Sequence, residues 1–303
     1  MTFDTIGIIT KRSDPKALKA TEDLTTWLQR RGHTVTVTEE VGRAANVTDR
    51  TVTRPQEEIA HGQDLMIVIG GDGTFIAAAR IIDAHSTPLL GINRGRLGFL
   101  TEIPTDTMFA DLEDVLAGRY RIEDRMMLSV SVVRDGNVIY RRRALNDAVV
   151  HIGALARMLE FVVAIDDQFV FRSRADGLIV ATPTGSTAYA LSAGGPIMHP
   201  ALDAILLVPV CPHTLTNRPI AVPGDGCVEI NVMPQDVSQL LTLDGQQGCS
   251  LQEEDRILIR RSVHSLKVLH SPNKNHYDVL RRKLSWGEIP ENDIPPLGQP
   301  IRK

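Results

Sequence analysis

The sequence predicts two domains: an N-terminal α/β domain with a doubly wound parallel sheet, and a C-terminal all-β domain that resembles a sandwich. Three observations support this division. Over the first 120 residues, short apolar runs alternate with amphipathic helical segments, as in proteins with parallel sheets. From residue 126 onward, short β-prone runs are joined by turn signals, which is typical of a sandwich. A chain of 303 residues is also long enough for two domains of ordinary size.

The first strand-helix-strand unit occupies the N-terminus. Residues 5–10 predict a buried strand, and Asp14 before Pro15 predicts the start of a helix that ends at Gly32. Residues 34–38 alternate as a second strand. We therefore expect a parallel pair of strands joined by a right-handed crossover.

The next segments continue this pattern. Residues 39–55 are polar and lack periodicity, which predicts a surface loop. An apolar strand at 64–69 leads through a glycine-rich turn into a helix at 75–84, and residues 88–92 predict another strand. An amphipathic helix is expected at 106–116.

The second domain is expected to span residues 122–278. Turn sequences at 135–137 and 166–168 lie between β-prone residues, which predicts hairpins. Further strands are expected at 205–210, 228–233 and 257–269. The α/β domain then covers residues 1–121, and the proline-containing tail 279–303 is expected to pack back on it.

Composition limits the classes of function. A net charge of −4 provides no basic field to attract a polynucleotide or an anionic membrane, so we expect neither nucleic-acid nor membrane partners. The cysteines at 211, 227 and 249 lie far apart and predict neither a zinc site nor a disulfide framework. No segment has the pattern of a secretory signal or the length of a membrane span. A cytoplasmic location is therefore expected.

The run Gly70 Gly71 Asp72 Gly73 Thr74 joins a predicted strand to a predicted helix. Glycines at a helix N-terminus let a phosphate approach the main chain, so Gly70, Gly71, Gly73 and Thr74 are predicted to bind phosphate. An acid in such a cradle would repel phosphate unless it binds Mg²⁺ or accepts a proton from an attacking hydroxyl. Asp72 is therefore the candidate catalytic residue. The alternative is a tight turn in which Asp72 caps the helix.

The same run differs from both common nucleotide-binding motifs. It lacks the ending of a Walker A motif and the spacing of GxGxxG. It resembles the GGDGT signature shared by NAD kinases, diacylglycerol kinases and sphingosine kinases. The segment GINRGRLGFL at 91–100 is similar to an NAD kinase segment that lipid kinases lack. Other segments similar to NAD kinases follow in order at 145–147, 176–189 and 212–219.

The resemblance to NAD kinases implies transfer of the γ-phosphoryl group of ATP to the 2′-hydroxyl of the adenosine ribose of NAD. Asp72 would be the general base, and Mg²⁺ would enter with ATP rather than occupy a resident metal site. Asn146 and Asp147 correspond to the family's Asn-Glu pair, with the shorter Asp147 in this chain, and match the two hydroxyls of a ribose. The NAD-binding residues implied are Asp72, Gly73, Asn146, Asp147, Arg157, Arg174, Asp176, Thr187, Ala188, Tyr189, Ala190, Leu191, Ser192 and Gln246.

Alternatives remain open at several of these positions. The hydroxyl-rich segment 182–187 is also typical of a turn that caps a helix, and Arg174 and Asp176 could form a surface pair. Two other functions compete with the NAD kinase activity: a lipid or sugar kinase of the same superfamily, and a non-catalytic NAD-binding sensor. The resemblance also implies a homodimer or homotetramer.

Overall fold

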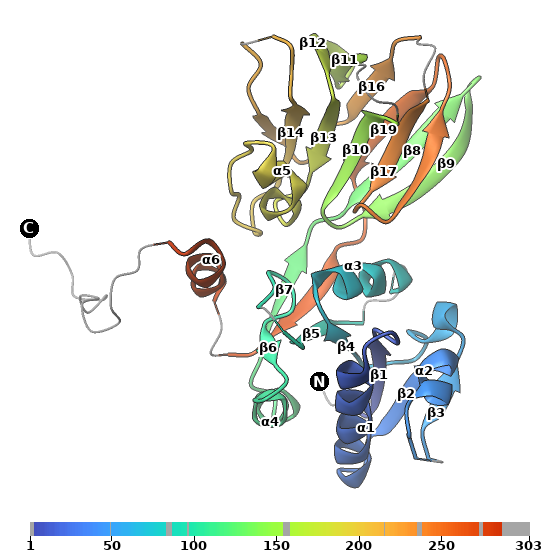
Figure 1. Cartoon of the computed structure of the whole chain (residues 1–303), viewed down its shortest axis with the longest axis vertical. Helices are drawn as coiled ribbons and strands as arrows, with labels where there is room; N and C mark the ends of the chain where they lie inside the picture. The colour runs from blue at the N-terminus through green and yellow to red at the C-terminus, as the bar shows by residue number, and fades with distance from the viewer. Residues whose placement is uncertain are drawn as a thin grey trace, which may run out of the picture.

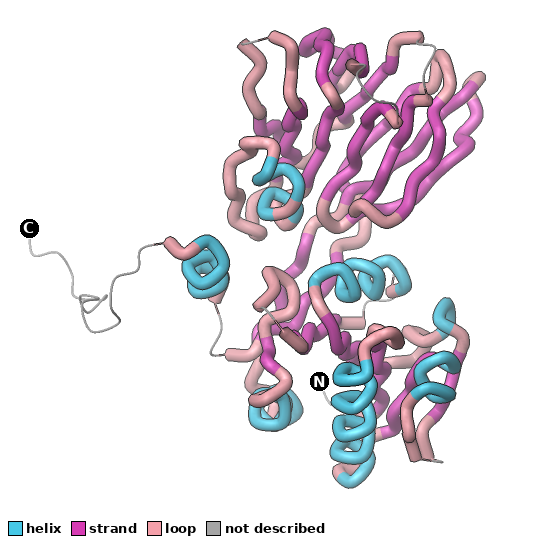
Figure 2. The backbone as a smooth tube through the Cα atoms, in the orientation of Figure 1, coloured by secondary structure: helices cyan, strands magenta, loops and turns pink. Residues whose placement is uncertain are grey.

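The computed structural model describes residues 3–48, 50–82, 87–95, 97–153, 158–214, 216–234, 238–272 and 275–286. An α/β part with a mostly parallel sheet lies beside an antiparallel β sandwich, and the two are joined by narrow connections (Figure 1). Helices cover the sheet of the first part, whereas the second part consists mostly of strands (Figure 2). The predicted fold class is confirmed.

The sheet of the α/β part has eight strands in the order β3-β2-β1-β4-β5-β20-β7, with β6 paired to β5. Neighbours from β3 to β20 run parallel, and β7 runs antiparallel to β20. The strand bounds are β1 Thr5–Thr10, β2 Thr34–Thr38, β3 Val52–Arg54, β4 Leu65–Gly70, β5 Leu89–Asn93, β6 Ile103–Pro104, β7 Arg121–Arg125 and β20 Leu266–His270.

The helices of this part follow the apolar spacing of the sequence. Helix α1 begins as predicted, because the Asp14 carboxylate accepts the backbone N–H groups of Lys16 and Ala17. It buries Leu24 and Leu28 against the sheet. The helix bounds are α1 Pro15–Arg30, α2 Glu39–Ala44, η1 Gln56–Glu58, α3 Asp72–Ile81 and α4 Met108–Leu116.

The prediction of a loop over residues 39–55 was wrong. Helix α2 starts at Glu39, where the Thr38 hydroxyl accepts the backbone N–H of Val41. Strand β3 then pairs in parallel with β2 and forms the edge of the sheet. A three-residue strand has no internal periodicity, so its pairing with β2, rather than its own sequence, makes it a strand.

The sandwich consists of two six-stranded sheets in the orders β15-β14-β13-β10-β17-β18 and β12-β11-β16-β19-β8-β9. The bounds are β8 Leu128–Arg134, β9 Asn137–Ala144, β10 Asp147–Ile152, β11 Leu159–Ile165, β12 Gln168–Ala175, β13 Gly177–Ala181, β14 Ala204–Val210, β15 Ile220–Pro223, β16 Val228–Val232, β17 Gln239–Leu243, β18 Gln247–Leu251 and β19 Arg256–Arg261. The short helices η2 Gly185–Thr187 and α5 Tyr189–Ser192 follow β13.

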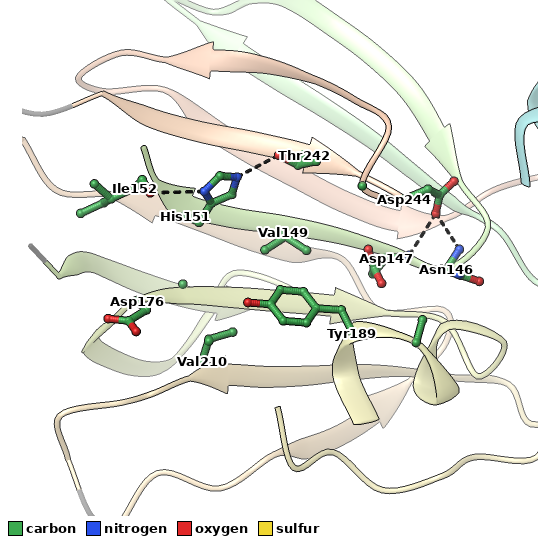
Figure 3. A pocket seen from close by; sticks show the side chains of 13 residues that line it. Asn146, Asp147, Val149, His151, Ile152, Asp176, Tyr189, Val210, Thr242 and Asp244 are labelled. Carbon is green, nitrogen blue, oxygen red and sulfur yellow. Dashed lines mark hydrogen bonds between the residues drawn. The ribbon is translucent and has the colours of Figure 1, made fainter. Parts of the chain in front are cut away.

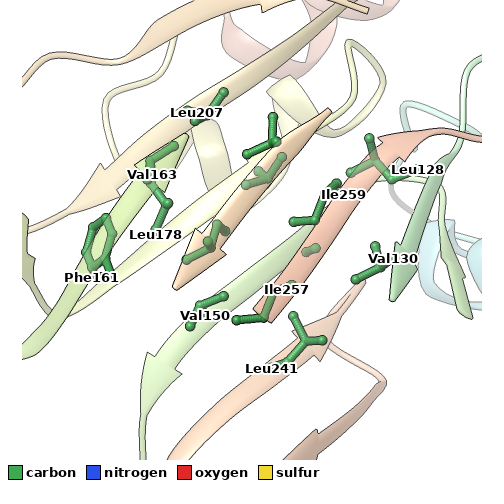
Figure 4. Close-up of a cluster of buried hydrophobic side chains, with 14 of the residues drawn as sticks. Leu128, Val130, Val150, Phe161, Val163, Leu178, Leu207, Leu241, Ile257 and Ile259 are labelled. Atoms are coloured by element: carbon green, nitrogen blue, oxygen red, sulfur yellow. The ribbon is translucent and has the colours of Figure 1, made fainter. Parts of the chain in front are cut away.

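Alternate side chains of the two sheets form the core of the sandwich (Figure 4). Strand β10 shows how this core places the functional residues. Ala148 and Val150 point into the core, so Asp147, Val149 and His151 project from the opposite face of the sheet. The core packing therefore fixes which residues face the pocket described below.

The segment 257–269 is not one strand, as the sequence predicted. It divides into β19, in the sandwich, and β20, in the first sheet, because the intervening residues turn between the two parts and Val263 is 95% exposed. Both β7 and β20 include residues assigned to the second domain, yet both pair in the first sheet. The domain boundaries at 121/122 and 278/279 therefore stay a proposal.

Helix α6, His276–Leu284, ends the described chain. Its His276 ring lies 5.1 Å from the ring of His199, which follows α5, and Lys283 lies 5.5 Å from the ring of Phe99, which follows β5. The helix therefore contacts both parts of the molecule. The predicted packing of the tail concerns mainly residues 287–303, which lie outside the described ranges. Among the residues described, no helix combines the length and apolar character needed to cross a membrane.

Candidate functional site

The glycine-rich turn stands where β4 ends and α3 begins. Gly71 has φ −105° and ψ −177°, an extended conformation open to any residue, so backbone angles do not require a glycine there. Space is the constraint instead, because a Cβ on Gly70 would lie 2.7 Å from Thr74 Oγ1. A Cβ on Gly71 would meet nothing within 4 Å. The outer side of the turn is therefore open to a ligand at the N-terminus of α3.

The Asp72 carboxylate is held by the loop that follows β5. Oδ1 accepts the backbone N–H groups of Leu100 and Thr101 at 3.1 and 3.2 Å and the Thr101 hydroxyl at 3.1 Å. Oδ2 accepts the backbone N–H of Phe99 at 2.8 Å. Asp72 is the first residue of α3 rather than its cap, so the alternative role of helix capping does not describe it. The segment similar to NAD kinases orients this acid.

A buried ion cluster supports the end of that loop. Glu102 lies beside His270, with 3.1 Å between Oε2 and Nδ1, and Glu123 approaches the other ring nitrogen at 3.4 Å. The backbone N–H of Ser271 also donates to Glu102. Burial alone would lower the pKa of His270, but the two glutamates together raise it. His270 in turn lowers the pKa of Glu123 to about 2. These contacts hold Glu102, the residue that follows Thr101, in place.

A cavity of about 570 Å³ opens on the outer face of the sheet formed by β10, β13, β14 and β17 (Figure 3). Tyr189 of α5 forms one wall and is 47% exposed. On the opposite side, His151 Nε2 lies 2.9 Å from Thr242 Oγ1. The lining is mixed polar and apolar, as in small-molecule sites, and consists of Asn146, Asp147, Val149, His151, Ile152, Asp176, Gly177, Ala188, Tyr189, Val210, Thr242, Asp244 and Gly245.

Two buried carboxyl groups lie at one end of this cavity. The Asp244 carboxylate accepts the backbone N–H groups of Leu145, Asn146 and Asp147 at 3.1, 2.8 and 3.2 Å. Among the described residues, none donates a hydrogen bond to the Asp147 carboxyl group. Burial, and then the nearby charge of Asp244, raise the pKa of Asp147 to about 7. Asp147 can therefore gain or lose a proton near neutral pH.

The turn between β17 and β18 joins this cavity to the glycine-rich turn. Asp244 and Gly245 line the cavity, and Gln246 Nε2 donates to the Gly73 carbonyl oxygen at 3.1 Å. Arg80 of α3 pairs with Asp244 at 3.5 Å and also hydrogen bonds to Gln246 Oε1. Figure 1 shows α3 just below the sandwich. The Asp72 turn and the cavity are thus neighbouring parts of one site.

The structure brings only some of the predicted NAD-binding residues into the cavity. Those that line it are Asn146, Asp147, Asp176, Ala188 and Tyr189, while Asp72, Gly73 and Gln246 lie at the adjoining turn.

The other predicted residues lie around the cavity or beyond the described chain. Ala190 is fully buried among apolar neighbours, and the Thr187 hydroxyl donates to the Thr184 carbonyl. Leu191 is partly buried, whereas Ser192 and Arg174 are exposed. In the described part of the chain, Arg174 and Asp176 form no ion pair, so the alternative of a surface pair is not realised. Arg157 lies outside the described residues.

The hydroxyl groups of residues 182–187 are used mainly within the protein. The Thr182 hydroxyl donates to the Leu145 carbonyl at 2.6 Å, and the Ser186 hydroxyl accepts the N–H of Met198 at 2.9 Å. A Cβ on Gly185 would lie 2.0 Å from the Asn146 carbonyl oxygen. This segment therefore packs tightly behind Asn146 and supports it.

Sequence reasoning did not identify Asp244, His151 or Thr242. The Asp-Gly pair at 244–245 is a common hairpin turn signal, but such a signal indicates a turn and not the role of Asp244 in the site. His151 and Thr242 lie at ordinary outward positions of their strands. Only the pairing of β10 with β17 brings them together.

Comparisons with known proteins decide the family. The models of the ATP-NAD kinase N-terminal and C-terminal domains match residues 6–120 and 145–271. An NAD kinase of Magnetococcus marinus is 55% identical over 287 residues, which cover 94% of this chain and 95% of that protein. An NAD kinase of Geobacter sp. is 45% identical over 93% of this chain and 99% of that protein. The chain belongs to the NAD kinase family. It is accordingly a kinase, a phosphotransferase that acts on an alcohol group.

Solved structures of NAD kinases have the same fold. The yeast NADH kinase complexed with NADH has a TM-score of 0.87 and 25% identity, covering 98% of this chain and 90% of that one. The NAD kinase from Archaeoglobus fulgidus in complex with ATP has a TM-score of 0.73 and 25% identity, covering 93% and 100%. The resemblance seen in the sequence is confirmed, and a lipid or sugar kinase or a non-catalytic sensor is not favoured.

Proposed function

We propose that this chain transfers the γ-phosphoryl group of ATP to the 2′-hydroxyl of the adenosine ribose of NAD, which gives NADP. The observation that carries this proposal is the turn at 244–246. It places a cavity suited to a small molecule next to an acid at an open helix N-terminus. Membership in the NAD kinase family supports NAD as acceptor and ATP as donor.

Asp72 is the proposed general base. Its Oδ1 receives three hydrogen bonds, whereas Oδ2 receives one, from Phe99. Oδ2 therefore keeps a lone pair for the proton of the ribose hydroxyl. The hydrogen bonds from loop 99–101 would hold that oxygen in place, which matters because phosphoryl transfer depends mainly on positioning and charge neutralisation.

The cavity is the proposed acceptor site. Asn146 offers a donor and an acceptor, and Asp147 accepts when ionised, which suits the hydroxyls of a ribose. Tyr189 offers an exposed ring on which a base can pack. Asp176 and Ala188 complete the polar and apolar lining. The other NAD contacts proposed are Gly73, Arg157, Arg174, Thr187, Ala190, Leu191, Ser192 and Gln246.

The donor phosphates are proposed to lie over Gly70, Gly71, Gly73 and Thr74. The open side of Gly71 leaves space for a phosphate oxygen beside the first N–H groups of α3. Mg²⁺ bound to the ATP phosphates would offset their charge next to Asp72. As the resemblance to NAD kinases implies, we assign this ion to the nucleotide rather than to a resident metal site.

Two broader features stay predictions. The resemblance to NAD kinases implies a homodimer or homotetramer. The composition and the cysteine pattern favour a cytoplasmic location.

The test is direct formation of NADP by purified protein supplied with NAD, ATP and Mg²⁺. Asp72→Asn should keep NAD affinity within a few-fold and reduce kcat by about a hundredfold or more, since general-base catalysis contributes roughly 10²–10⁴-fold. Asp23→Asn, an exposed change on α1, is the matched control and should be unaffected. Near-normal turnover of the Asp72 variant would exclude it as the base. Absence of NADP with the unmodified protein would contradict the proposed reaction.

A further inference from the structure

His270, the last residue of β20, lies between two carboxylates at the end of the loop that orients Asp72. Its Nδ1 is 3.1 Å from Glu102 Oε2, and its Nε2 is 3.4 Å from Glu123 Oε2. His270 and Glu102 are both buried, and both ring nitrogens are shielded from solvent. The two carboxylates are therefore the groups that determine where the ring carries its protons.

This arrangement favours the charged form of the ring. A neutral imidazole has one N–H and one lone pair, so one of the two carboxylates would face a lone pair. The imidazolium has an N–H on each nitrogen and can face both. Burial by itself lowers the pKa of His270, but Glu102 and Glu123 raise it above its ordinary value of 6.5. The folded protein therefore keeps this proton to a higher pH than an ordinary histidine does.

The two carboxylates differ in how much they depend on this proton. Glu123 also pairs with Arg125 at 2.9 Å and with Arg121 at 3.1 Å, both on β7, so it keeps positive partners when the ring is neutral. Within the described ranges, His270 is the one basic side chain that forms an ion pair with Glu102. Loss of the His270 proton therefore affects Glu102 most.

The neighbouring helices do not supply a second cation. On α6, burial is the main cause that lowers the pKa of His276 to about 4, so this ring is uncharged at neutral pH. On α4, Asp111 accepts the Ser271 hydroxyl at 2.8 Å. The backbone N–H of Ser271 donates to Glu102 Oε1 at 3.2 Å. The end of β20 thus holds both oxygens of Glu102, one through Ser271 and the other through His270.

Glu102 directly follows the loop that holds the proposed base. Thr101, the preceding residue, supplies two of the four hydrogen bonds to the Asp72 carboxylate. Its hydroxyl oxygen also accepts a hydrogen bond from Asn93 Nδ2 at 2.9 Å. Since successive Cα atoms stay about 3.8 Å apart, a displacement of Glu102 is passed to Thr101. The position of Asp72 therefore depends on how firmly Glu102 is held.

A buried ion pair that only stabilises the fold is the simpler explanation of these contacts. The place of Glu102 in the chain argues against it, because the three residues before Glu102 supply all four of the hydrogen bonds to Asp72 described above. The two explanations also differ in what they change. A purely structural pair affects stability, whereas a positioning pair affects kcat and its dependence on pH.

We propose that His270 is a positioning residue for the phosphoryl transfer: its imidazolium holds Glu102, and through Glu102 the loop that orients the Asp72 carboxylate. His270 does not line the cavity and acts only through these neighbours. Turnover should fall at alkaline pH, when the ring loses its proton, and at acid pH, when Asp72 gains one. The role of His270 rests on the proposed function, in which Asp72 is the base.

The first experiment measures kcat for NADP formation from about pH 6 to about pH 10, with Mg²⁺ and with NAD and ATP at saturation. Saturating NAD removes effects on binding in the cavity, where Asp147 also titrates. In the unmodified protein, kcat should fall at alkaline pH with the loss of one proton. His270→Gln should reduce kcat about tenfold at neutral pH, keep the KM for NAD and for ATP within about twofold, and lose the alkaline fall.

His33→Gln is the matched control. His33 is a partly buried histidine whose Nδ1 lies 2.7 Å from the Phe3 carbonyl oxygen. It precedes β2, at the amino ends of the parallel strands, whereas Asp72 follows the carboxyl end of β4. This variant should keep the kcat and the pH profile of the unmodified protein. Thermal melting curves show whether each variant is folded.

The second experiment follows the His270 proton directly by NMR of protein with isotope-labelled histidine rings. The His270 signal is the one missing from His270→Gln, and its titration midpoint should coincide with the midpoint of the alkaline fall in kcat. Glu102→Gln removes the charge that the ring balances and keeps an acceptor for the Ser271 N–H. Its alkaline fall should therefore disappear although His270 is present. This variant carries the test if His270→Gln does not fold.

Three results would overturn the positioning role while leaving the proposed function intact. They are an alkaline fall in folded His270→Gln equal to that of the unmodified protein, an equal fall in Glu102→Gln, and a His270 titration during which kcat does not change. NADP is still formed in each of these cases. If the unmodified protein formed no NADP at any pH, the proposed reaction and the role of His270 in it would both be wrong.

Discussion

Gly98 lies so close to the proposed base that its replacement tests how much the position of Asp72 matters. A Cβ added to Gly98 would lie 2.0 Å from Asp72 Oδ1 and 2.5 Å from Thr101 Oγ1, whereas ordinary contacts are 3.4–4 Å. Gly98 is not among the residues with positive φ, so alanine introduces no strain of that kind. In Gly98→Ala, the carboxylate must therefore move by more than about 1 Å.

We expect Gly98→Ala to reduce catalysis more than it reduces stability. A displacement of about 1 Å can reduce turnover roughly a hundredfold, and this is the change in kcat that we expect for Gly98→Ala. Loss of one or two of the hydrogen bonds to Asp72 should lower the free energy of unfolding by about 1–3 kcal/mol. The assay compares NADP formation with NAD binding measured separately, because Gly98 does not line the cavity and binding there should change little.

Gly95→Ala provides the matched control in the same loop. A Cβ at Gly95 meets no atom within 4 Å, so this variant should keep nearly full activity. If Gly98→Ala were as active as Gly95→Ala, the position of the Asp72 carboxylate would not limit the reaction.

Two further predictions concern the buried acids of the cavity. Asp244→Ala removes the acceptor of three backbone N–H groups and the partner of Arg80. It should therefore lower the free energy of unfolding, measured in urea, by about 3–5 kcal/mol, and Asp244→Asn should lower it by less. A loss below about 1 kcal/mol for the alanine variant would contradict this structural role of Asp244. Asp147, with a pKa of about 7 in the folded protein and an ordinary value of 3.8, holds a proton between about pH 4 and pH 7 that the unfolded chain has lost. The free energy of unfolding should therefore fall by up to about 4 kcal/mol as the pH rises through this window, and Asp147→Asn should remove that fall. The measurement is urea unfolding of both proteins from pH 5 to 8. If the free energy of unfolding changed with pH equally in both, Asp147 would not be responsible.

Several features were determined by residues that are close in the sequence. The strands at Thr5–Thr10 and Thr34–Thr38 have the predicted bounds, and the cap and proline at 14–15 start α1 as expected. The glycine-rich turn also lies between a strand and a helix, as its neighbours imply. Periodicity and capping act over a few residues, so the sequence alone is sufficient to recognise them.

The arrangement of the site was decided by contacts between residues far apart in the chain. Asp72 is oriented by an N–H 27 residues away, and Asp244 orders a backbone segment 97 residues before it. The split of 257–269 between two sheets and the strand pairing of β3 likewise depend on which neighbours are available.

The sequence by itself therefore determined the family, the fold class and the chemical candidates. Only the tertiary structure decided that Asp244 and Gln246 join the cavity to Asp72, and that His270 meets Glu102 at the end of the loop that orients Asp72. The physical reason is that side chains on one strand or helix reach their partners only after the sheets pack. Packing is a property of the whole chain rather than of any local pattern.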